Sequence, residues 1–188
     1  MSDIATLGAA LRAYGQTYPS EVAVVSRFES LLAEGPHAFR RDRLAGHFTA
    51  SAWVLDPGRR QVLLVLHRKL GKWLQPGGHA DGNTSLIDVA RKEVLEETQI
   101  PTATPAASGL LETPPILDLD IHTIPARGSV PEHEHYDVRY LLVAHAARLP
   151  QGNEENHDAR WVPLASLEEF SREASILRMR EKAIASVR

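Results

Sequence analysis

The sequence predicts a single domain of the α/β or α+β class, in which strands and helices share one hydrophobic core. Segments with helical periodicity and segments of strand-like sequence follow one another along the chain. No repeat and no convincing linker divides them, and 188 residues are enough for one sizeable core. We therefore expect a sheet packed against helices.

Two helices are predicted at the start of the chain, over residues 3–14 and 19–34. Apolar residues recur at helical spacing in the second, and a Gly-Pro pair follows its end. The segment 47–56 then partly alternates between polar and apolar residues, as a half-buried strand does. A turn after it leads into the apolar segment 61–66, so the two are predicted to form a hairpin.

The second half of the chain predicts a further helix that begins near Asn83–Ser85 and runs to about Thr98, where Pro101 stops it. The remaining predicted elements are a loop over 101–115, strands near 117–124, 136–144 and 159–162, and a closing helix from about Ser171 to Ala185.

The composition excludes several classes of protein. Without cysteine there is no disulfide framework, no cysteine-ligated metal and no thiol nucleophile, so chemistry must come from carboxylates and the nine histidines. A formal net charge of −3 argues against a general binder of nucleic acids or anionic membranes. No apolar run approaches the roughly 20 residues of a membrane span. With no basic segment before an apolar stretch at the N-terminus, we expect a cytoplasmic protein.

A glycine-rich loop that precedes an acidic helix carries the chemistry. Residues 77–82 read Gly-Gly-His-Ala-Asp-Gly, and Glu93, Glu96 and Glu97 follow within an arc of roughly 100° on the predicted helix. Such close like charges repel each other, and a hard divalent cation relieves that repulsion. The alternative is a solvated acidic face, which is the commoner fate of glutamate clusters.

The spacing resembles the Nudix box, Gly-x5-Glu-x7-Arg-Glu-U-x-Glu-Glu-x-Gly-U, in which U is aliphatic. The positions that match are Gly78, Glu93, Val94, Glu96, Glu97 and Ile100. Three positions depart from the pattern: Thr84 replaces the first Glu, Lys92 replaces the Arg, and Gln99 replaces the last Gly. Lysine keeps the charge without the planar fork of arginine, and a left-handed backbone is costlier for glutamine, so the helix exit is expected to differ.

The resemblance implies an α/β/α sandwich with a mixed sheet. It divides the single domain into a helical N-terminal extension (1–45), a core (46–165) and a C-terminal helix (166–188). The extension is a candidate for a cover over the substrate, a homodimer contact or an enlargement of the core. We expect the resemblance to hold over roughly residues 45–165.

The activity that the resemblance implies is hydrolysis of a diphosphate linkage in a nucleoside diphosphate derivative or a similar small organic diphosphate, with Mg²⁺ or Mn²⁺. Glu96 and Glu97 are the implied metal ligands, assisted by the carbonyl of Gly77. Glu93 is a ligand, the general base or the group that orients the base, so Glu93 and Glu97 are the catalytic candidates. Loop candidates for the base are Glu154, Glu155 and Asp158, whose ordinary role is a polar turn. The alternative function is a non-catalytic module that binds metal or ligand.

Four histidines suggest a second metal site. His133 and His135 share one face of the strand that they enter, and Asp137 and Arg139 continue it. His47 begins an earlier strand and His79 follows Gly78. Imidazoles from three segments suit a transition metal better than Mg²⁺. The alternatives are phosphate contacts, partners of the glutamates or plain strand-edge histidines.

The histidine pattern is also similar to isopentenyl-diphosphate isomerase, a relative on the Nudix fold. That family has His-x-x-x-Ser, like His47 to Ser51, then Gly-His, like Gly78-His79, and two acidic residues near the positions of His133 and His135. Its catalytic cysteine falls near Gly77, and this chain contains no cysteine. An isomerase-like diphosphate enzyme is therefore the weaker alternative. Glu132 and Glu134 are reserve ligands. No such pattern supports a metal-binding role for the other histidines, which are His37, His67, His122, His145 and His157.

Basic residues near the box are candidates for holding substrate phosphates. The candidates are Arg68, Lys69, Lys72 and Arg139. For the first three the alternative is a charged surface loop. Trp73 and Tyr136 are candidates for stacking on a base, with core packing favoured for Trp73.

Overall fold

The fold is described by a computed structural model, which covers residues 3–103, 115–152 and 156–186. The helices are α1 (Asp3–Thr17), α2 (Val22–Leu32), α3 (Leu86–Thr98), α4 (Leu167–Phe170) and α5 (Ala174–Ser186), with 3-10 turns η1 (Pro19–Glu21), η2 (Gly35–Phe39) and η3 (Leu164–Ser166). The strands are β1 (Gly46–Leu55), β2 (Gln61–His67), β3 (Lys72–Leu74), β4 (Gly77–His79), β5 (Thr102–Ala103), β6 (Ile116–Ile124), β7 (His133–Ala144) and β8 (Asn156–Pro163).

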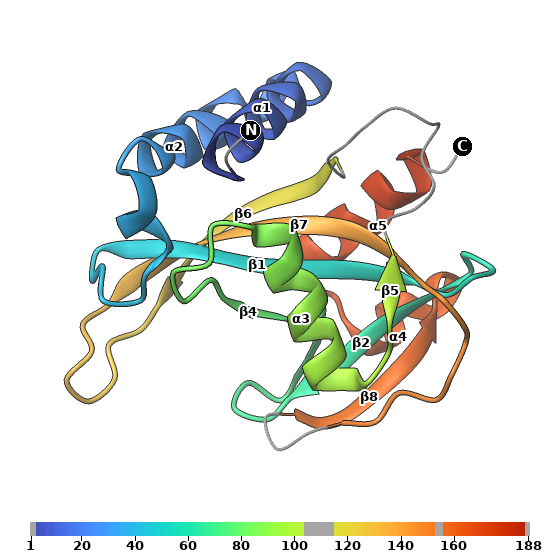
Figure 1. Cartoon of the computed structure of the whole chain (residues 1–188). Coiled ribbons are helices and arrows are strands. Elements are labelled where there is room, and N and C mark those ends of the chain that lie inside the picture. The colour runs from blue at the N-terminus through green and yellow to red at the C-terminus, as the bar shows by residue number, and fades with distance from the viewer. Residues whose placement is uncertain (1–2, 104–114, 153–155, 187–188) are drawn as a thin grey trace.

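The strands form one mixed sheet around a parallel pair, β1 and β7, in which His47 lies opposite His135. β4 and β2 pair antiparallel with successive parts of β1, and β3 and β8 pair with β2. β6 and β5 pair antiparallel with β7. Helices flank this curled sheet (Figure 1), so the predicted mixed sheet between helices is confirmed.

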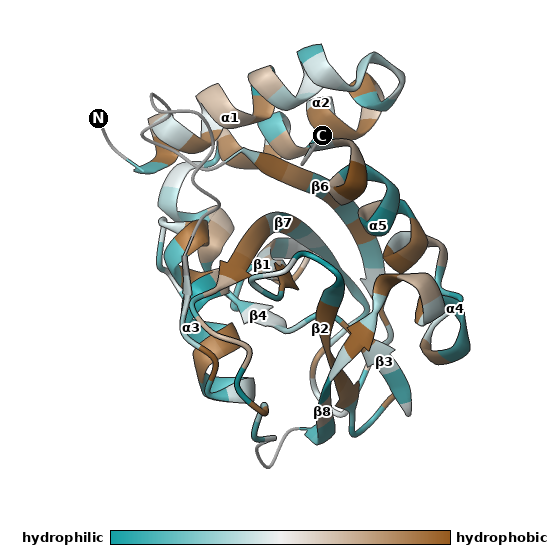
Figure 2. Ribbon diagram, turned by 90° about the vertical axis from the view of Figure 1, so that its right-hand side faces the viewer, coloured by the Kyte–Doolittle hydropathy of each residue, from teal (hydrophilic) through white to brown (hydrophobic). Residues whose placement is uncertain are grey.

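Two apolar clusters hold the layers together. The first joins α1, α2 and α3 to the sheet through residues such as Phe28 and Phe48. The second joins α4 and α5 to the sheet around Trp53. Hydrophobic residues accordingly line β6 and β7 beneath the N-terminal helices (Figure 2). Burial of these large side chains is the main stabilising contribution to the fold.

The N-terminal helices belong to the core of the molecule. α1 and α2 pack against each other and against β6 (Figure 1). Leu11 and Phe28 are fully buried there. Among the three roles considered for this segment, the structure supports enlargement of the core. The described residues include no helix that is both long and apolar enough to cross a membrane.

β1 changes character along one of its faces. Phe48 and Ala50 lie on the face that belongs to the first cluster, whereas His47, Thr49 and Ser51 lie on the other. Further along this second face Trp53 and Leu55 belong to the second cluster, and the histidines gather around His47 at its polar end.

Several boundaries differ from the prediction. β7 begins at His133, three residues before the expected start, because His133 and His135 pair with β6 and His135 also pairs with β1. The short strands β3 and β4 form only by pairing with β2 and β1, a long-range requirement that local sequence does not report. The expected loop over 101–115 contains β5 at its start, and residues 104–114 lie outside the described part.

Candidate active site

Helix α3 carries the acidic cluster and packs against β1 and β4. Leu86, Val89, Ala90 and Val94 form its buried side. Ser85 precedes the helix and bonds through its hydroxyl to Asp88. Because Glu93 and Glu97 border this buried side, the helix holds these two carboxylates at the sheet, whereas Glu96 is exposed.

The two inner carboxylates lie against the glycine pair of β4. The backbone N–H of Gly77 donates to Oε1 of Glu97 at 3.2 Å, and Glu97 is only 8% exposed. A Cβ added at Gly78 would come within 2.6 Å of the carboxyl carbon of Glu93. Glycine at this position therefore lets the glutamate approach the strand backbone closely.

These residues fit a hard divalent cation. The carboxylates of Glu93 and Glu97 lie against the backbone of β4, and carboxylate oxygens are donors of the kind that Mg²⁺ and Mn²⁺ take. The outer glutamate, Glu96, is about half exposed, and its carboxylate pairs with Lys92 at 3.0 Å. The Lys92 ammonium also lies 3.8 Å from Glu93 and so partly offsets the repulsion between the two glutamates.

The other two departures from the box have clear structural consequences. Gln99 adopts the left-handed conformation, with φ 57° and ψ 22°, and its N–H bonds to the carbonyl of Leu95. The expectation of a different helix exit was therefore wrong: glutamine takes the glycine-like geometry at some conformational cost. Thr84 donates to Asp3 at 3.0 Å and so links the box loop to α1.

The four predicted histidines come together on the polar face of the sheet. The rings of His47 and His135 are 5.0 Å apart between centroids, and His79 lies 4.8 Å from His135. His133 stacks on His47 at 5.3 Å. For His47, His133 and His135, one donor atom from each ring lies within 4.8 Å of the others. The predicted convergence is thus present.

Three histidines of this cluster, His47, His79 and His135, have lowered pKa values and are neutral at neutral pH. Burial, followed by the charge of Arg41, lowers the pKa of His79 to about 4. Burial and the neighbouring imidazoles lower the pKa of His135 to about 2, and burial also lowers the pKa of His47. Neutral imidazole is the form that offers a nitrogen lone pair.

One histidine of this face was missed. The sequence gives no support to His122 as a ligand, yet its ring lies 5.4 Å from that of His135, because β6 places it directly opposite His135. The alternation Asp118, Asp120, His122 on one strand face was the signal available in the sequence. The reserve ligand Glu134 points the other way, where Arg27 and Tyr136 bind its carboxylate.

A buried polar layer continues from the histidines along the same face. Asp137 accepts hydrogen bonds from Thr49 at 3.2 Å and Ser51 at 2.7 Å. Arg139 follows, 3% exposed, with ion pairs to Asp118, Asp120 and Asp137 of 2.8–3.1 Å. With three carboxylates around its guanidinium, Arg139 holds β6 to β7 and is poorly placed for substrate.

Comparison with known proteins agrees with this geometry. The family model described as NUDIX domain matches residues 46–181. The chain belongs to the Nudix family. The prediction of a Nudix-type pyrophosphohydrolase is therefore confirmed at the level of the family. No match was found among curated proteins.

Solved Nudix structures share the fold. A Nudix-family hydrolase from Clostridium perfringens is 26% identical, with a TM-score of 0.55 over 76% of this chain and 98% of that one. An Ap4A hydrolase from C. elegans, in a binary complex, is 15% identical, with a TM-score of 0.52 over 74% and 96%. The NUDIX domain of NrtR from Shewanella oneidensis, in complex with ADP ribose, is 20% identical, with a TM-score of 0.51 over 83% and 98%.

The remaining substrate candidates lie at the surface, in the turn between β2 and β3 and at the start of β3. Arg68 and Lys69 occupy the exposed turn after β2, and Lys72 begins β3 and pairs with Glu173 at 2.9 Å. Trp73 packs edge-on against Phe170, as core packing requires. Of the candidates for the general base on the later loop, Glu154 and Glu155 lie outside the described residues. Asp158 pairs with Arg160 on β8.

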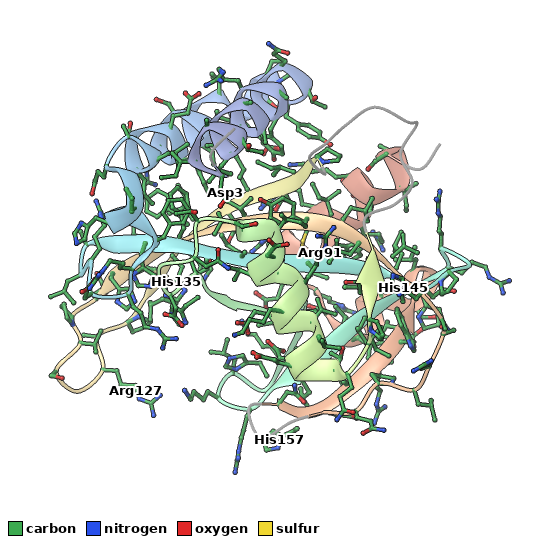
Figure 3. All side chains as sticks on the ribbon, in the orientation of Figure 1. Asp3, Arg91, Arg127, His135, His145 and His157 are labelled. Atoms are coloured by element: carbon green, nitrogen blue, oxygen red, sulfur yellow. The ribbon has the colours of Figure 1, made fainter. Side chains whose placement is uncertain are left out.

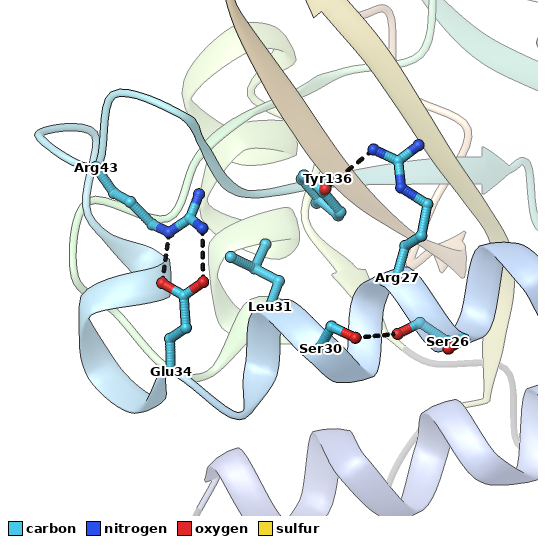
Figure 4. A pocket seen from close by; sticks show the side chains of 7 residues that line it. All are labelled: Ser26, Arg27, Ser30, Leu31, Glu34, Arg43 and Tyr136. Carbon is cyan, nitrogen blue, oxygen red and sulfur yellow. Dashed lines mark hydrogen bonds and ion pairs between the residues drawn. The ribbon is translucent and has the colours of Figure 1, made fainter.

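A separate pocket of about 230 Å³ lies between α2 and β7 (Figure 4). Its two arginines already bind carboxylates: Arg27 pairs with Glu134 at 2.7 Å and Arg43 with Glu34 at 2.6 Å. Tyr136, a candidate for stacking on a base, lines this pocket, on the face of β7 opposite to His135. The pocket is therefore distinct from the Nudix box.

Gly77 weighs against the isomerase-like alternative. A Cβ added at this position would come within 2.7 Å of the Cα of Ser51 on β1 and 2.8 Å of the carbonyl oxygen of Ala50. Neither is the end of a flexible side chain, so no side chain fits there without moving the backbone. A cysteine side chain therefore does not fit at the position that corresponds to the catalytic cysteine of the isomerase family.

Proposed function

We propose that this Nudix protein hydrolyses the diphosphate linkage of a nucleoside diphosphate derivative or a similar organic diphosphate, with Mg²⁺ or Mn²⁺ at the box. The observation that carries the proposal is the approach of Glu93 and Glu97 to the glycine pair of β4. Glu93, Glu96, Glu97 and the carbonyl of Gly77 are the proposed ligand set. Its oxygen donors support Mg²⁺ or Mn²⁺ over softer ions.

The chain's own residues divide the work. Glu97, held by the N–H of Gly77, would hold the cation, and Glu96 would supply a second carboxylate from the exposed side. Glu93 either completes the ligand set or takes the proton of the attacking water. When bound, a divalent cation neutralises charge on the phosphoryl oxygens and makes a bound water more acidic. Arg68, Lys69 and Lys72 are proposed to hold the substrate phosphates.

The nucleotide class of substrate is supported by analogy. The similar structures include an Ap4A hydrolase and a NUDIX domain bound to ADP ribose. Ap4A and ADP ribose both contain phosphoanhydride linkages attached to adenosine. We therefore propose a panel of dinucleoside polyphosphates and nucleoside diphosphate sugars as the first substrates to test.

The test measures release of mononucleotide from this panel with Mg²⁺ and with Mn²⁺. Glu96→Gln and Glu97→Gln are each expected to lower kcat at least ~100-fold, because each removes a charged metal ligand. Glu169→Gln, an exposed change on α4 that keeps the same chemistry, is the matched control and should leave kcat unchanged. Unchanged turnover in both box variants would refute the mechanism. Tight nucleotide binding without product in the wild type would instead favour the non-catalytic module.

A further inference from the structure

The histidine cluster has the geometry of a metal site of its own. His47 comes from β1, and His133 and His135 come from β7, so two adjacent strands with a fixed parallel register hold all three rings. Their nearest donor atoms lie within 4.8 Å of one another. His79, on β4, lies opposite Thr49 and brings a fourth ring to the same place. Side chains on paired strands are held more rigidly than side chains on loops.

The hydrogen bonds of the rings leave the other nitrogen available. Nδ1 of His133 donates to the carbonyl of Pro131 at 2.9 Å, and Nδ1 of His47 faces the carbonyl of Arg43 at 3.4 Å. A carbonyl can only accept, so the proton is on Nδ1 and Nε2 carries the lone pair. An Nδ1–H held by a carbonyl is the usual support of a metal-binding histidine.

Two of these nitrogens are buried without any hydrogen-bond partner among the described residues: Nε2 of His47 and Nε2 of His135. His47 is only 2% exposed, so bulk water does not reach it freely. A buried polar atom without a partner costs about 1–3 kcal/mol. Two such atoms in one cluster indicate that the site is built for something that satisfies both.

We propose that His47, His133 and His135 bind one divalent transition metal ion, with His79 as the fourth ligand. Imidazole nitrogens select ions of the Zn²⁺, Co²⁺, Ni²⁺ and Fe²⁺ class and are poor ligands for Mg²⁺. The site is separate from the carboxylates of the box, which take oxygen-seeking cations. It begins one residue beyond Gly78, so the two ions would be neighbours on β4.

The surroundings of the cluster support this assignment. His122 packs edge-on against His135, and its Nδ1 lies 3.1 Å from a carboxylate oxygen of Asp120. Asp137, next on the face of β7, is tied to β1 through Thr49 and Ser51. These bonds fix the spacing of β1 and β7, and thereby the spacing of the ligands.

The experiment uses untagged, full-length protein stripped with a chelator and titrated with Co²⁺, whose ligand-field absorption reports its coordination. Saturation at one equivalent per chain is expected, and millimolar Mg²⁺ should leave the spectrum unchanged. The double variant H133A/H135A should bind at least ~100-fold more weakly, beyond the loss seen for an outer-shell contact. The matched control is H145A/H157A, two exposed histidines far from His135 (Figure 3), which should bind as the wild type does.

The result is separable from the proposed hydrolase activity and from misfolding. Glu97→Gln should retain the Co²⁺ spectrum even if turnover is lost. X-ray absorption of wild-type protein loaded with Zn²⁺ should show nitrogen ligands at about 2.0–2.1 Å, whatever the fate of the variants. No saturable binding, displacement by Mg²⁺, equal binding in H133A/H135A or an oxygen-only shell would each overturn the proposal.

Discussion

Gly78→Ala is expected to lower the activity that depends on the Nudix box while leaving the stability of the fold almost unchanged. The added Cβ would lie 2.6 Å from the carboxyl carbon of Glu93, whereas ordinary contacts begin at 3.4 Å, so the carboxylate must retreat by about 0.8 Å. The carboxylate is the far end of a flexible side chain, so the backbone can stay in place when it moves. A misplacement near 1 Å typically costs ~100-fold in rate, which is about 2.7 kcal/mol in the barrier.

The assay compares kcat/KM with the midpoint of thermal unfolding. Gly78→Ala should lose ~100-fold in kcat/KM, with a melting temperature close to that of the wild type, because alanine is tolerated in a strand at ordinary φ. Gly77→Ala should instead destabilise the protein, because its Cβ would meet the backbone of Ser51. Gly15→Ala in α1, with ordinary contacts of 3.6 Å or more, is the control and should be active. Wild-type kinetics in Gly78→Ala would refute a role for the position of Glu93.

Three further changes probe the framework, each measured by urea unfolding. Arg139→Met removes the shared partner of two buried aspartates, Asp118 and Asp137, and of the partly buried Asp120, and should cost about 3–5 kcal/mol; a loss under 1 kcal/mol would contradict its structural role. Gln99→Gly relieves the left-handed backbone at φ 57° and should stabilise by about 1 kcal/mol, and a destabilised variant would contradict this. Phe28→Ala opens a cavity beneath the N-terminal helices and should cost about 3–5 kcal/mol; a neutral result would show that these helices lie outside the cooperative core.

The box helix was predictable because its information is local. Glu93, Glu96 and Glu97 follow one helical period, and the apolar positions of the same period specify which side faces the sheet. The convergence of His47 with His135 was also predictable. Strand alternation and the order of the histidine motifs, which resembles that of isopentenyl-diphosphate isomerase, place both residues on one face. The first inference needs only a short stretch of sequence and the regular geometry of one element, whereas the second also requires β1 and β7 to pair.

Long-range pairing explains what local sequence missed. His122 joins the histidines because β6 pairs with β7 in one register, and a shift by a single residue would turn it away. Arg139 shares the face that local alternation predicted, yet the neighbouring strand surrounds it with aspartates and buries it. Partners of this kind depend on residues distant in sequence.

The sequence by itself determined the family, the acidic helix and the absence of any cysteine chemistry, because each rests on residue identity and spacing. Only the tertiary structure decided which charged groups face the site and which are buried in ion pairs inside the fold. It placed Arg139 with its aspartates, closed Gly77 against Ser51 and left two buried histidine nitrogens without hydrogen-bond partners in the part of the chain that the structure describes. The physical reason is that burial and pairing depend on neighbours brought together by the sheet, and these set the chemistry of a side chain as much as its identity does.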